Sequence, residues 1–229
     1  MTFAVAEQPL SLGEQIANGI AEDILQERLK PGDSIPEQHL AQQYQVSRGP
    51  IREALRILEK EGVVQILPRR GARVTQLTVT EVDDIFVIRA HLFGLAASLF
   101  VGRAAAEDLF CLNTLFKRMK GLAPEQATTH AEVSAQMALV LLEQCGNDRL
   151  RSMILQLARQ VARYTQLGLQ ANERRRASIA SWRAMLRALR QRESQQAENV
   201  GRQMVLNTRR EVTVQLNAVQ SQPKVELAG

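Results

Sequence analysis

The stretch from Val46 to Gly62, VSRGPIREALRILEKEG, constrains the fold more than any other segment of this chain. Its apolar residues recur at helical spacing and form one face, which consists of Ile51, Ala54, Leu55 and Leu58. Arginines spaced four residues apart lie on a different face, namely Arg48, Arg52 and Arg56. Ser47 is placed to cap the helix, Pro50 follows where a missing N–H costs nothing, and Gly62 is placed to end it. A short helix with one buried face and one arginine face suits insertion into the major groove of DNA.

The segment before this arginine helix predicts a helix-turn-helix. A short helix over residues 37–44 ends just before Ser47, which is the tight spacing of that motif. A longer helix over residues 12–29 precedes it, and the turn Lys30-Pro31-Gly32-Asp33 separates the two.

The segment after the arginine helix predicts a wing. Strands over residues 63–67 and 72–74 flank the basic turn Pro68-Arg69-Arg70-Gly71, where Gly71 leaves room to approach a phosphate or a minor groove. Residues 45–76 hold seven Arg or Lys residues against three acids, a net charge of +4. Positive charge gathered on one small element is expected of a surface that binds phosphates.

Residues 10–76 resemble the winged helix-turn-helix of GntR-type bacterial transcription regulators, because residues 46–62 match V-S-R-x-P-[IV]-R-E-A-L-x-x-L-x-x-E-G nearly completely. Gln38 departs from an arginine that is frequent in relatives. Since an amide prefers adenine where arginine prefers guanine, the DNA site is expected to differ at one base or to lose one contact. The residues that the resemblance and the arginine face assign to DNA binding are Gln38, Ser47, Arg48, Gly49, Pro50, Arg52, Arg56, Arg70 and Gly71.

Composition sets bounds on the rest of the chain. Of the 229 residues, 45% are apolar and only 4% aromatic, which favours a mainly α protein. Cys111 and Cys145 are too far apart to suggest a metal site or a disulfide framework, and we expect both to be reduced thiols in the core. The N-terminus lacks the pattern of a signal peptide, and no apolar run approaches the roughly 18 residues of a membrane helix. We therefore expect a soluble, cytoplasmic protein with no membrane partner.

The predicted domains are a winged helix-turn-helix over residues 8–76, a connector over 77–80, an all-α bundle over 81–220 and a flexible tail over 221–229. Thr80 is the predicted cap at the start of the bundle. The helices that we expect in this part cover residues 80–105, 107–121, 124–145, 148–171, 175–192 and 194–219. Six amphipathic helices with short connections predict a six-helix bundle.

This arrangement resembles the FadR subgroup of the same family and its smaller, VanR-like branch. The motif around Arg89 in Val87–Leu92 and the helix break Gly146-Asn147-x-x-Leu150 carry this second resemblance. It implies that the bundle binds a small metabolite and forms the homodimer.

Many relatives bind a divalent metal through an Asp-x-x-x-His pair and two further histidines. By the resemblance, these positions fall on Ser134, Ala138, Trp182 and Met204, which do not provide the imidazole or carboxylate donors of such a site. The histidines of the chain do not cluster by spacing and fall at His39, His91 and His130. We therefore predict no metal and no cofactor.

If an effector binds, its site is expected to be partly apolar, with Ala138, Trp182 and Met204 in the wall and Arg89, Ser134 or Asn147 as polar anchors. Arg89 is the expected anchor for an anion, because an unpaired buried guanidinium is costly. Two alternatives remain open. Trp182 and Met204 fill the space as ordinary core, or Arg89 forms a salt bridge.

The arginines over residues 174–192 favour a solvated helix face, with a dimer surface or a phosphate contact as alternatives. The function that we predict is a sequence-specific transcriptional regulator, a metabolite-responsive repressor that binds a short inverted repeat as a homodimer. One alternative is a DNA-binding protein whose bundle only dimerises. Another is an enzyme fused to a DNA-binding module, which the absence of catalytic motifs disfavours.

Overall fold

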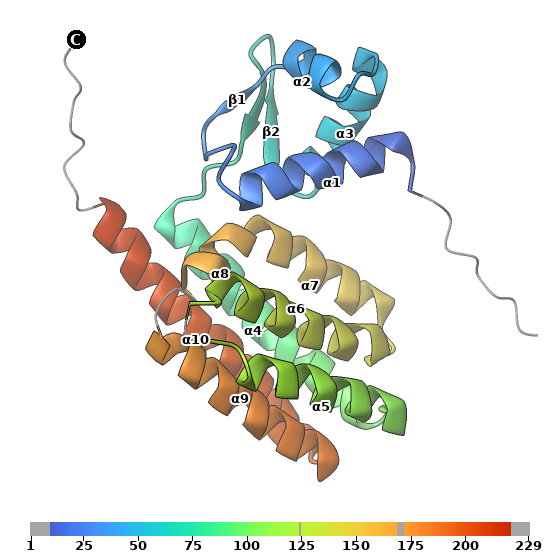
Figure 1. The fold of residues 1–229 in the computed structure, drawn as a ribbon, viewed down its shortest axis with the longest axis vertical. Helices are drawn as coiled ribbons and strands as arrows, with labels where there is room; N and C mark the ends of the chain where they lie inside the picture. Colours follow the sequence, from blue (N-terminus) through green and yellow to red (C-terminus); the bar gives the residue numbers. More distant parts are fainter. Residues whose placement is uncertain (1–9, 124, 169–171, 221–229) are drawn as a thin grey trace, which may run out of the picture. The chain divides into compact units, whose positions relative to one another are not determined.

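A computed structural model describes residues 10–123, 125–168 and 172–220 of the chain. It confirms the mainly α fold with one small sheet, and the chain divides into two compact units between Gln76 and Leu77 (Figure 1). The predicted tail over residues 221–229 and the first two residues of the predicted DNA-binding domain lie outside the described residues.

The first unit contains α1 (Leu12–Leu25), α2 (Glu37–Gln43) and α3 (Arg48–Lys60). Its core joins α1 to α3 through buried side chains, namely Ile16, Ile20, Ile24, Ile51, Leu55 and Leu58. Helix α1 approaches α3 closely at Gly13, where an added Cβ would lie 2.6 Å from Cδ of Glu53 and would displace that exposed side chain. The packing of α1 therefore sets the position of α3.

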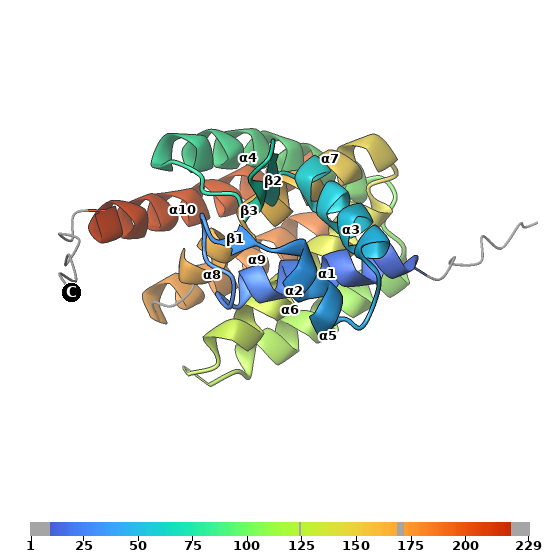
Figure 2. The ribbon, with the colours of Figure 1, turned by 90° about the horizontal axis from the view of Figure 1, so that it is seen from above.

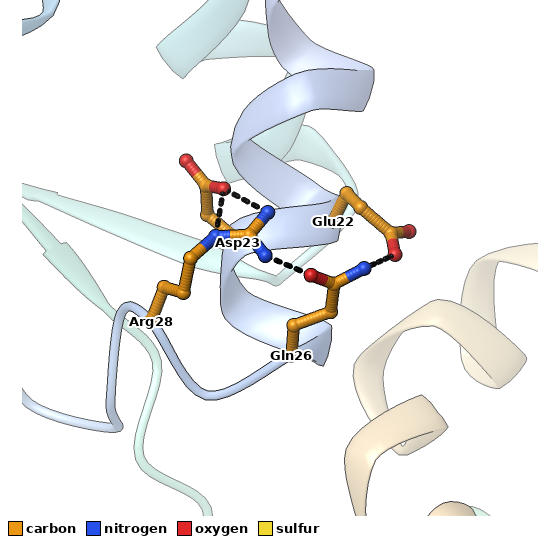
Figure 3. A network of polar contacts seen from close by, with 4 residues as sticks. All are labelled: Glu22, Asp23, Gln26 and Arg28. Atoms are coloured by element: carbon orange, nitrogen blue, oxygen red, sulfur yellow. Dashed lines mark hydrogen bonds and ion pairs between the residues drawn. The ribbon is translucent and has the colours of Figure 1, made fainter. Parts of the chain in front are cut away.

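Helix α1 ends four residues earlier than the predicted Leu29. The chain reverses at Glu27, which has a positive φ of 59°, and the amides of Arg28 and Leu29 then donate to the carbonyl oxygen of Asp23. Figure 3 shows the side chains that surround this end: Arg28 Nε donates to Oδ1 of Asp23 at 2.7 Å, and Arg28 also contacts Gln26. The helix therefore ends where a left-handed residue and local hydrogen bonds replace the helical pattern.

The sheet of the first unit has three antiparallel strands in the order β1-β3-β2, with β1 at Ser34–Ile35, β2 at Val64–Leu67 and β3 at Gly71–Val74. The predicted wing strands correspond to β2 and β3, where Leu67 pairs with Gly71. Strand β1 was not predicted. It is two residues long, too short to show an alternating pattern, and depends on pairing with the distant Ala72 and Arg73.

The described part of the second unit contains seven helices where six were predicted. They are α4 (Val79–Val101), α5 (Ala106–Lys120), α6 (Ala127–Gln144), α7 (Asp148–Gln160), α8 (Ala162–Gly168), α9 (Asn172–Arg190) and α10 (Ser194–Gln220). The predicted helix over residues 148–171 is wrong as one element, because the chain leaves helical geometry at Val161. Val161 is fully buried in a small cluster with Phe86 and Val212. The predicted cap Thr80 is also wrong, since Thr78 and Glu81 form the capping box of α4.

Helices α4 and α10 lie side by side and antiparallel (Figures 1 and 2). Gly94 of α4 faces Gly201 of α10, where a Cβ on Gly94 would lie 2.8 Å from the carbonyl oxygen of Glu198. About three turns nearer the start of α4, Asp83 forms a two-bond ion pair with Arg209, with 2.6 Å between Nη2 of Arg209 and Oδ2 of Asp83. Close backbone packing and this ion pair hold the two helices together.

The expectation that no apolar run approaches the length of a membrane helix is wrong for α4. Within the described residues, α4 is long and apolar enough to cross a membrane by length and composition. Its composition is explained by its place in the bundle, where the buried residues include Val82, Phe86, Ala90, Phe93, Ala96, Ala97 and Phe100. The helix is therefore accounted for as a core helix.

Candidate nucleic-acid interface and ligand cavity

The turn between α2 and α3 has the geometry of a helix-turn-helix. Gln45 adopts a positive φ of 53°, and the amide of Val46 donates to the carbonyl oxygen of Ala41. Ser47 occupies the N-cap position of α3, but its side chain forms no capping hydrogen bond, which corrects the predicted cap. Its hydroxyl therefore remains available to another acceptor or donor, such as a phosphate.

The arginine face of α3 is solvent-exposed, whereas the opposite face is buried. Arg48, Arg52 and Arg56 are exposed, and a shallow groove along the helix is lined by Gly49, Arg52, Glu53, Arg56, Ile57 and Lys60. Gln38 is exposed on α2, and Pro50 is half-buried in the first turn of α3. The helix thus presents several cationic donors along one side, as major-groove recognition requires.

Arg52 has a partner that the sequence analysis missed. Its Nε lies 2.9 Å from Oε2 of Glu37, and its side chain is 60% exposed. Glu37 lies in the first turn of α2, next to Gln38, so the ion pair joins the two helices of the motif. A carboxylate at this distance favours one direction of the guanidinium before DNA is bound.

The wing exposes Arg70 and Gly71 at its turn. Arg69 and Gly71 have positive φ values of 61° and 75°, and the amide of Arg70 donates to the carbonyl oxygen of Leu67 at 3.1 Å. Glycine at position 71 fits this backbone conformation, which L side chains rarely adopt. The turn therefore presents two arginines beside an unobstructed stretch of backbone.

The second unit contains a cavity of about 280 Å³ among its helices. Five of the six residues predicted to contact an effector line it, namely Arg89, Ser134, Ala138, Trp182 and Met204. Trp182 is almost fully buried, and its Nε1 donates to Oγ of Ser134 at 2.9 Å. The four positions that the resemblance assigns to metal ligands in relatives therefore meet in one space.

Asn147 is the predicted contact that the structure places elsewhere. It is the N-cap of α7, where its Oδ1 accepts a hydrogen bond from the amide of Leu150 at 3.0 Å. It does not line the cavity. The chain reverses between α6 and α7 at Gly146, which has a positive φ, and Asn147 then caps the start of α7. The Gly-Asn motif is therefore explained by this turn.

Arg89 enters the cavity from α4. Its Nε is shielded from solvent and has no hydrogen-bond partner, and its guanidinium lies 5.3 Å from the centre of the Phe86 ring. Burial lowers the pKa of Arg89 to about 10, so the side chain remains charged at neutral pH. Within the described residues Arg89 forms no ion pair, which leaves the predicted salt bridge without support.

Arg174 is a second cation in the cavity, and it corrects the prediction that the arginines over 174–192 form a solvated face. Its Nη2 donates to Oγ1 of Thr208 at 2.6 Å, whereas its Nε and Nη1 are shielded and have no hydrogen-bond partner. Burial lowers its pKa, and the charge of Glu211 partly offsets this effect. The sequence did contain a signal for this position of Arg174. Arg174, Ser178 and Trp182 recur every four residues, so they share one helix face, and all three line the cavity. The prediction is also wrong for Arg175, which is 8% exposed, but it holds for Arg183, Arg187 and Arg190, which are exposed.

His130 lies one turn before Ser134 on α6 and is 2% exposed. Its Nε2 has no hydrogen-bond partner. Burial lowers the pKa of His130 to about 4, with a further contribution from the charges of Arg175 and Arg174. The imidazole is therefore neutral at pH 7.

The residues at the positions of the relatives' metal ligands do not fit a divalent metal. They offer one hydroxyl, already bonded to Trp182, and one thioether, which are poor donors for such an ion. Among the described residues, no three His, Cys, Asp or Glu side chains gather in a way that could hold a metal. The cysteines also differ from each other: Cys145 is buried as predicted, whereas Cys111 is exposed, which corrects its predicted place in the core.

Comparison with known families identifies both units. The sequence model of the bacterial regulatory proteins of the gntR family matches residues 12–74, and that of the FCD domain matches residues 84–207. The chain is 40% identical over 106 residues to YdhC, an uncharacterised HTH-type transcriptional regulator of Bacillus subtilis strain 168, which covers 46% of this chain and 47% of that protein. It is 35% identical over 115 residues to the gluconate operon transcriptional repressor of Bacillus licheniformis, covering 48% and 45%. The matches thus span about half the length of these relatives.

Solved structures include a protein with a similar fold over nearly the whole chain. McbR/YncC of Escherichia coli superposes with a TM-score of 0.73 at 22% identity, covering 93% of this chain and 100% of that one. At this identity the likeness concerns the fold alone, and it supports the arrangement of helices within the two units.

Proposed function

Because the chain belongs to the GntR family of bacterial regulatory proteins and carries an FCD domain, we propose that it is a metabolite-responsive repressor that binds a short inverted repeat in DNA as a homodimer. That the chain is a DNA-binding transcriptional regulator follows from the family. Repression, the inverted repeat, the homodimer and the response to a small molecule are the proposed parts. A regulator of this kind must reach chromosomal DNA, so we also infer a cytoplasmic location.

The exposed arginine face of α3 supports the proposed mode of DNA binding. Arg48 and Arg52 would read base edges in the major groove, and Arg70 at the wing would contact phosphates or the minor groove. Phosphate contacts would make the affinity fall steeply with salt. Two copies related by a two-fold axis would read two half-sites of opposite orientation, which is why we propose an inverted repeat.

Exposed apolar side chains support a homodimer formed through the second unit. Ile88 and Leu95 lie seven residues apart on one face of α4 and are 50% and 43% exposed, and Met153 on α7 is also exposed. Large apolar side chains that share a helix face are typical of protein interfaces. A second copy of this chain would cover them and would also bring two DNA-binding units together.

The cavity is the observation that carries the proposed response to a metabolite. Its two arginines and the threonine that binds one of them come from three helices: Arg89 from α4, Arg174 from α9 and Thr208 from α10. Helix α4 begins directly after the boundary between the two units. A ligand that binds more tightly to one arrangement of these helices would shift the population toward it, and α4 would transmit the change to the DNA-binding unit.

One observation favours a second candidate, in which the bundle only dimerises. Trp182 and Ser134 satisfy each other by a hydrogen bond, and Trp182 packs within the main core cluster. The indole N–H of Trp182 therefore has an acceptor without a ligand. The buried guanidinium nitrogens of Arg89 and Arg174, which lack acceptors, favour the metabolite-responsive reading instead.

The test is the binding of the full chain to DNA from upstream of its own gene, with and without a metabolite library, at one fixed salt concentration. We expect saturable binding to an inverted repeat, with one homodimer per site by light scattering, and a change in affinity with at least one metabolite. Tight binding that no metabolite alters would favour the bundle that only dimerises. Binding of a single copy to a site without symmetry would contradict the homodimer.

A further inference from the structure

The cavity of the second unit holds two arginines whose shielded nitrogens lack hydrogen-bond acceptors. We propose that it binds a small organic carboxylate with an apolar body, whose two oxygens accept hydrogen bonds from Arg89 and Arg174 without a metal ion. The proposal rests on the proposed function in treating this cavity as the effector site. It adds the chemical class of the ligand and the residues that select it.

The buried donors favour an anion over a neutral ligand. Nε of Arg89, and Nε and Nη1 of Arg174, are shielded from solvent without an acceptor, although buried polar groups in proteins are nearly always hydrogen-bonded. Two cations facing one space favour an acceptor that carries negative charge, because charge-assisted hydrogen bonds are about twice as strong as neutral ones. Arginine presents its donors as a planar fork that matches the two oxygens of a carboxylate.

Thr208 fixes one of these cations. Its Oγ1 accepts a hydrogen bond from Nη2 of Arg174, and it donates in turn to the carbonyl oxygen of Met204, one turn earlier on α10. This arrangement holds one corner of the Arg174 guanidinium to α10 and leaves Nε and Nη1 without an acceptor. The donor is therefore positioned before a ligand arrives.

The remaining wall selects an apolar body. It consists largely of aliphatic and aromatic side chains, including Phe93, Leu142, Ile154, Leu155, Trp182 and Val205. At about 280 Å³ the cavity is slightly smaller than the range of about 300–1,000 Å³ that small-molecule sites occupy, which favours a small ligand. Hydroxyls also line the cavity, those of Ser134, Thr165, Ser178, Ser181 and Thr208, but those of Thr165 and Thr208 donate to backbone carbonyl oxygens. Because most of the wall is apolar, an aryl or short-chain carboxylate fits it better than a phosphate.

The positions that hold metal ligands in relatives support a metal-free site. Ser134, Ala138, Trp182 and Met204 provide neither imidazole nor carboxylate, and the cationic charge of the cavity comes from Arg89 and Arg174 instead. The arginines thus supply the positive charge and the hydrogen-bond donors that an anionic ligand needs.

The experiment is a titration of the purified full chain without DNA, in EDTA, with benzoate and octanoate as probes. Trp182 is the single tryptophan of the chain and lines the cavity, so its fluorescence reports binding directly. Benzamide and octanamide are matched neutral controls of nearly the same shape. We expect saturable binding of at least one carboxylate, and about tenfold or greater weakening for its amide, since hydrogen bonds to charged groups are worth about 1.5–3 kcal/mol.

Arg89→Met and Arg174→Met are expected to weaken carboxylate binding by about ten- to a hundredfold. Arg183→Met is the matched control, because Arg183 is an exposed arginine on the same helix as Arg174. Unfolding curves without ligand show whether each variant folds. Arg89→Met is expected to unfold at a higher temperature than the parent, because it removes a buried charge without a partner.

Four outcomes would overturn the proposal: no saturable binding of either carboxylate, equal binding of the amides, a requirement for added Zn²⁺ or Mn²⁺, or tighter binding of inorganic phosphate. Equal weakening by Arg183→Met would also contradict it. These outcomes are separate from the proposed function. Carboxylate binding that leaves DNA affinity unchanged would count against the metabolite-responsive repressor alone, whereas a neutral effector that changes DNA affinity would count against the carboxylate alone.

Discussion

Arg52 on α3 forms an ion pair with Glu37 on α2, with 2.9 Å between Nε and Oε2. The pair joins the two helices of the helix-turn-helix through side chains that are 60% and 32% exposed. An exposed pair of this kind contributes about 0–1 kcal/mol to folding. Its consequence lies in recognition, because it sets the direction of an arginine that we expect to read DNA.

Arg52→Ala should weaken binding to the specific DNA site by about 1–3 kcal/mol and relax preference at one base position. The fold should remain intact, because Arg52 lies on the exposed face of α3. Fluorescence anisotropy at fixed salt measures the affinity, and a thermal unfolding curve checks the fold. Unchanged affinity for the specific site would remove Arg52 from base reading.

Glu37→Gln should lower the ratio of specific to non-specific DNA affinity. The carboxylate that directs Arg52 is lost, so specific binding weakens, while removal of a negative charge near the phosphates strengthens binding to scrambled DNA. Titrations of both DNAs at two salt concentrations give this ratio. Glu107→Gln, in the first turn of α5, is a control with the same charge change in the other unit. An identical change in the ratio for both variants would mean that net charge alone is responsible.

Gly94→Ala should destabilise the second unit by about 1–3 kcal/mol, because its Cβ would lie 2.8 Å from a backbone oxygen that cannot move independently of α10. Gly102→Ala, at the C-cap of the same helix, is the control, because the nearest atom there lies 3.8 Å from the added Cβ. Chemical denaturation of both variants measures the difference. Equal stability would show that α4 and α10 separate at little cost.

The stability of the second unit should fall as the pH decreases from about 6.5 to about 4. Burial lowers the pKa of His130 to about 4 in the folded chain, so the unfolded chain binds the extra proton first as the pH falls below the ordinary value of 6.5. Arg174 and Arg175 act in the same direction, because their charges oppose a protonated imidazole. His130→Gln should flatten this dependence in unfolding curves recorded across the range. A parallel pH dependence in parent and variant would assign the loss to other groups.

The sequence was most informative where one segment carried several agreeing signals. The apolar and arginine faces of α3 follow from helical spacing alone, and the turn residues of the wing are local. The missed features depend on distant partners. Strand β1 exists because Ser34 and Ile35 pair with β3, and the break at Val161 exists because its side chain is buried against Phe86 and Val212.

In the cavity, too, some residues could be predicted from the sequence, whereas others depend on partners that are distant in the chain. The resemblance assigned Trp182 and Met204 to positions of metal ligands in relatives, and both residues line the cavity. Arg174 was assigned to solvent because it stands in a run of arginines, and only the packing of α9 against α10 brings it to Thr208. Asn147 was assigned to the site because of its motif, but the amide of Leu150 uses its side chain.

Strand β1 has a consequence for how the first unit can follow the shape of DNA. It pins the segment between α1 and α2 to β3, while Oε1 of Glu59 on α3 accepts the amide of Ile66 in β2 at 3.2 Å. The α3 helix and the β2–β3 hairpin are therefore held at a fixed separation. We expect this fixed separation to tolerate a changed base within the DNA that the unit spans. An inserted base pair would displace one of the two contacts by one base-pair step, and the contact at that end would be lost.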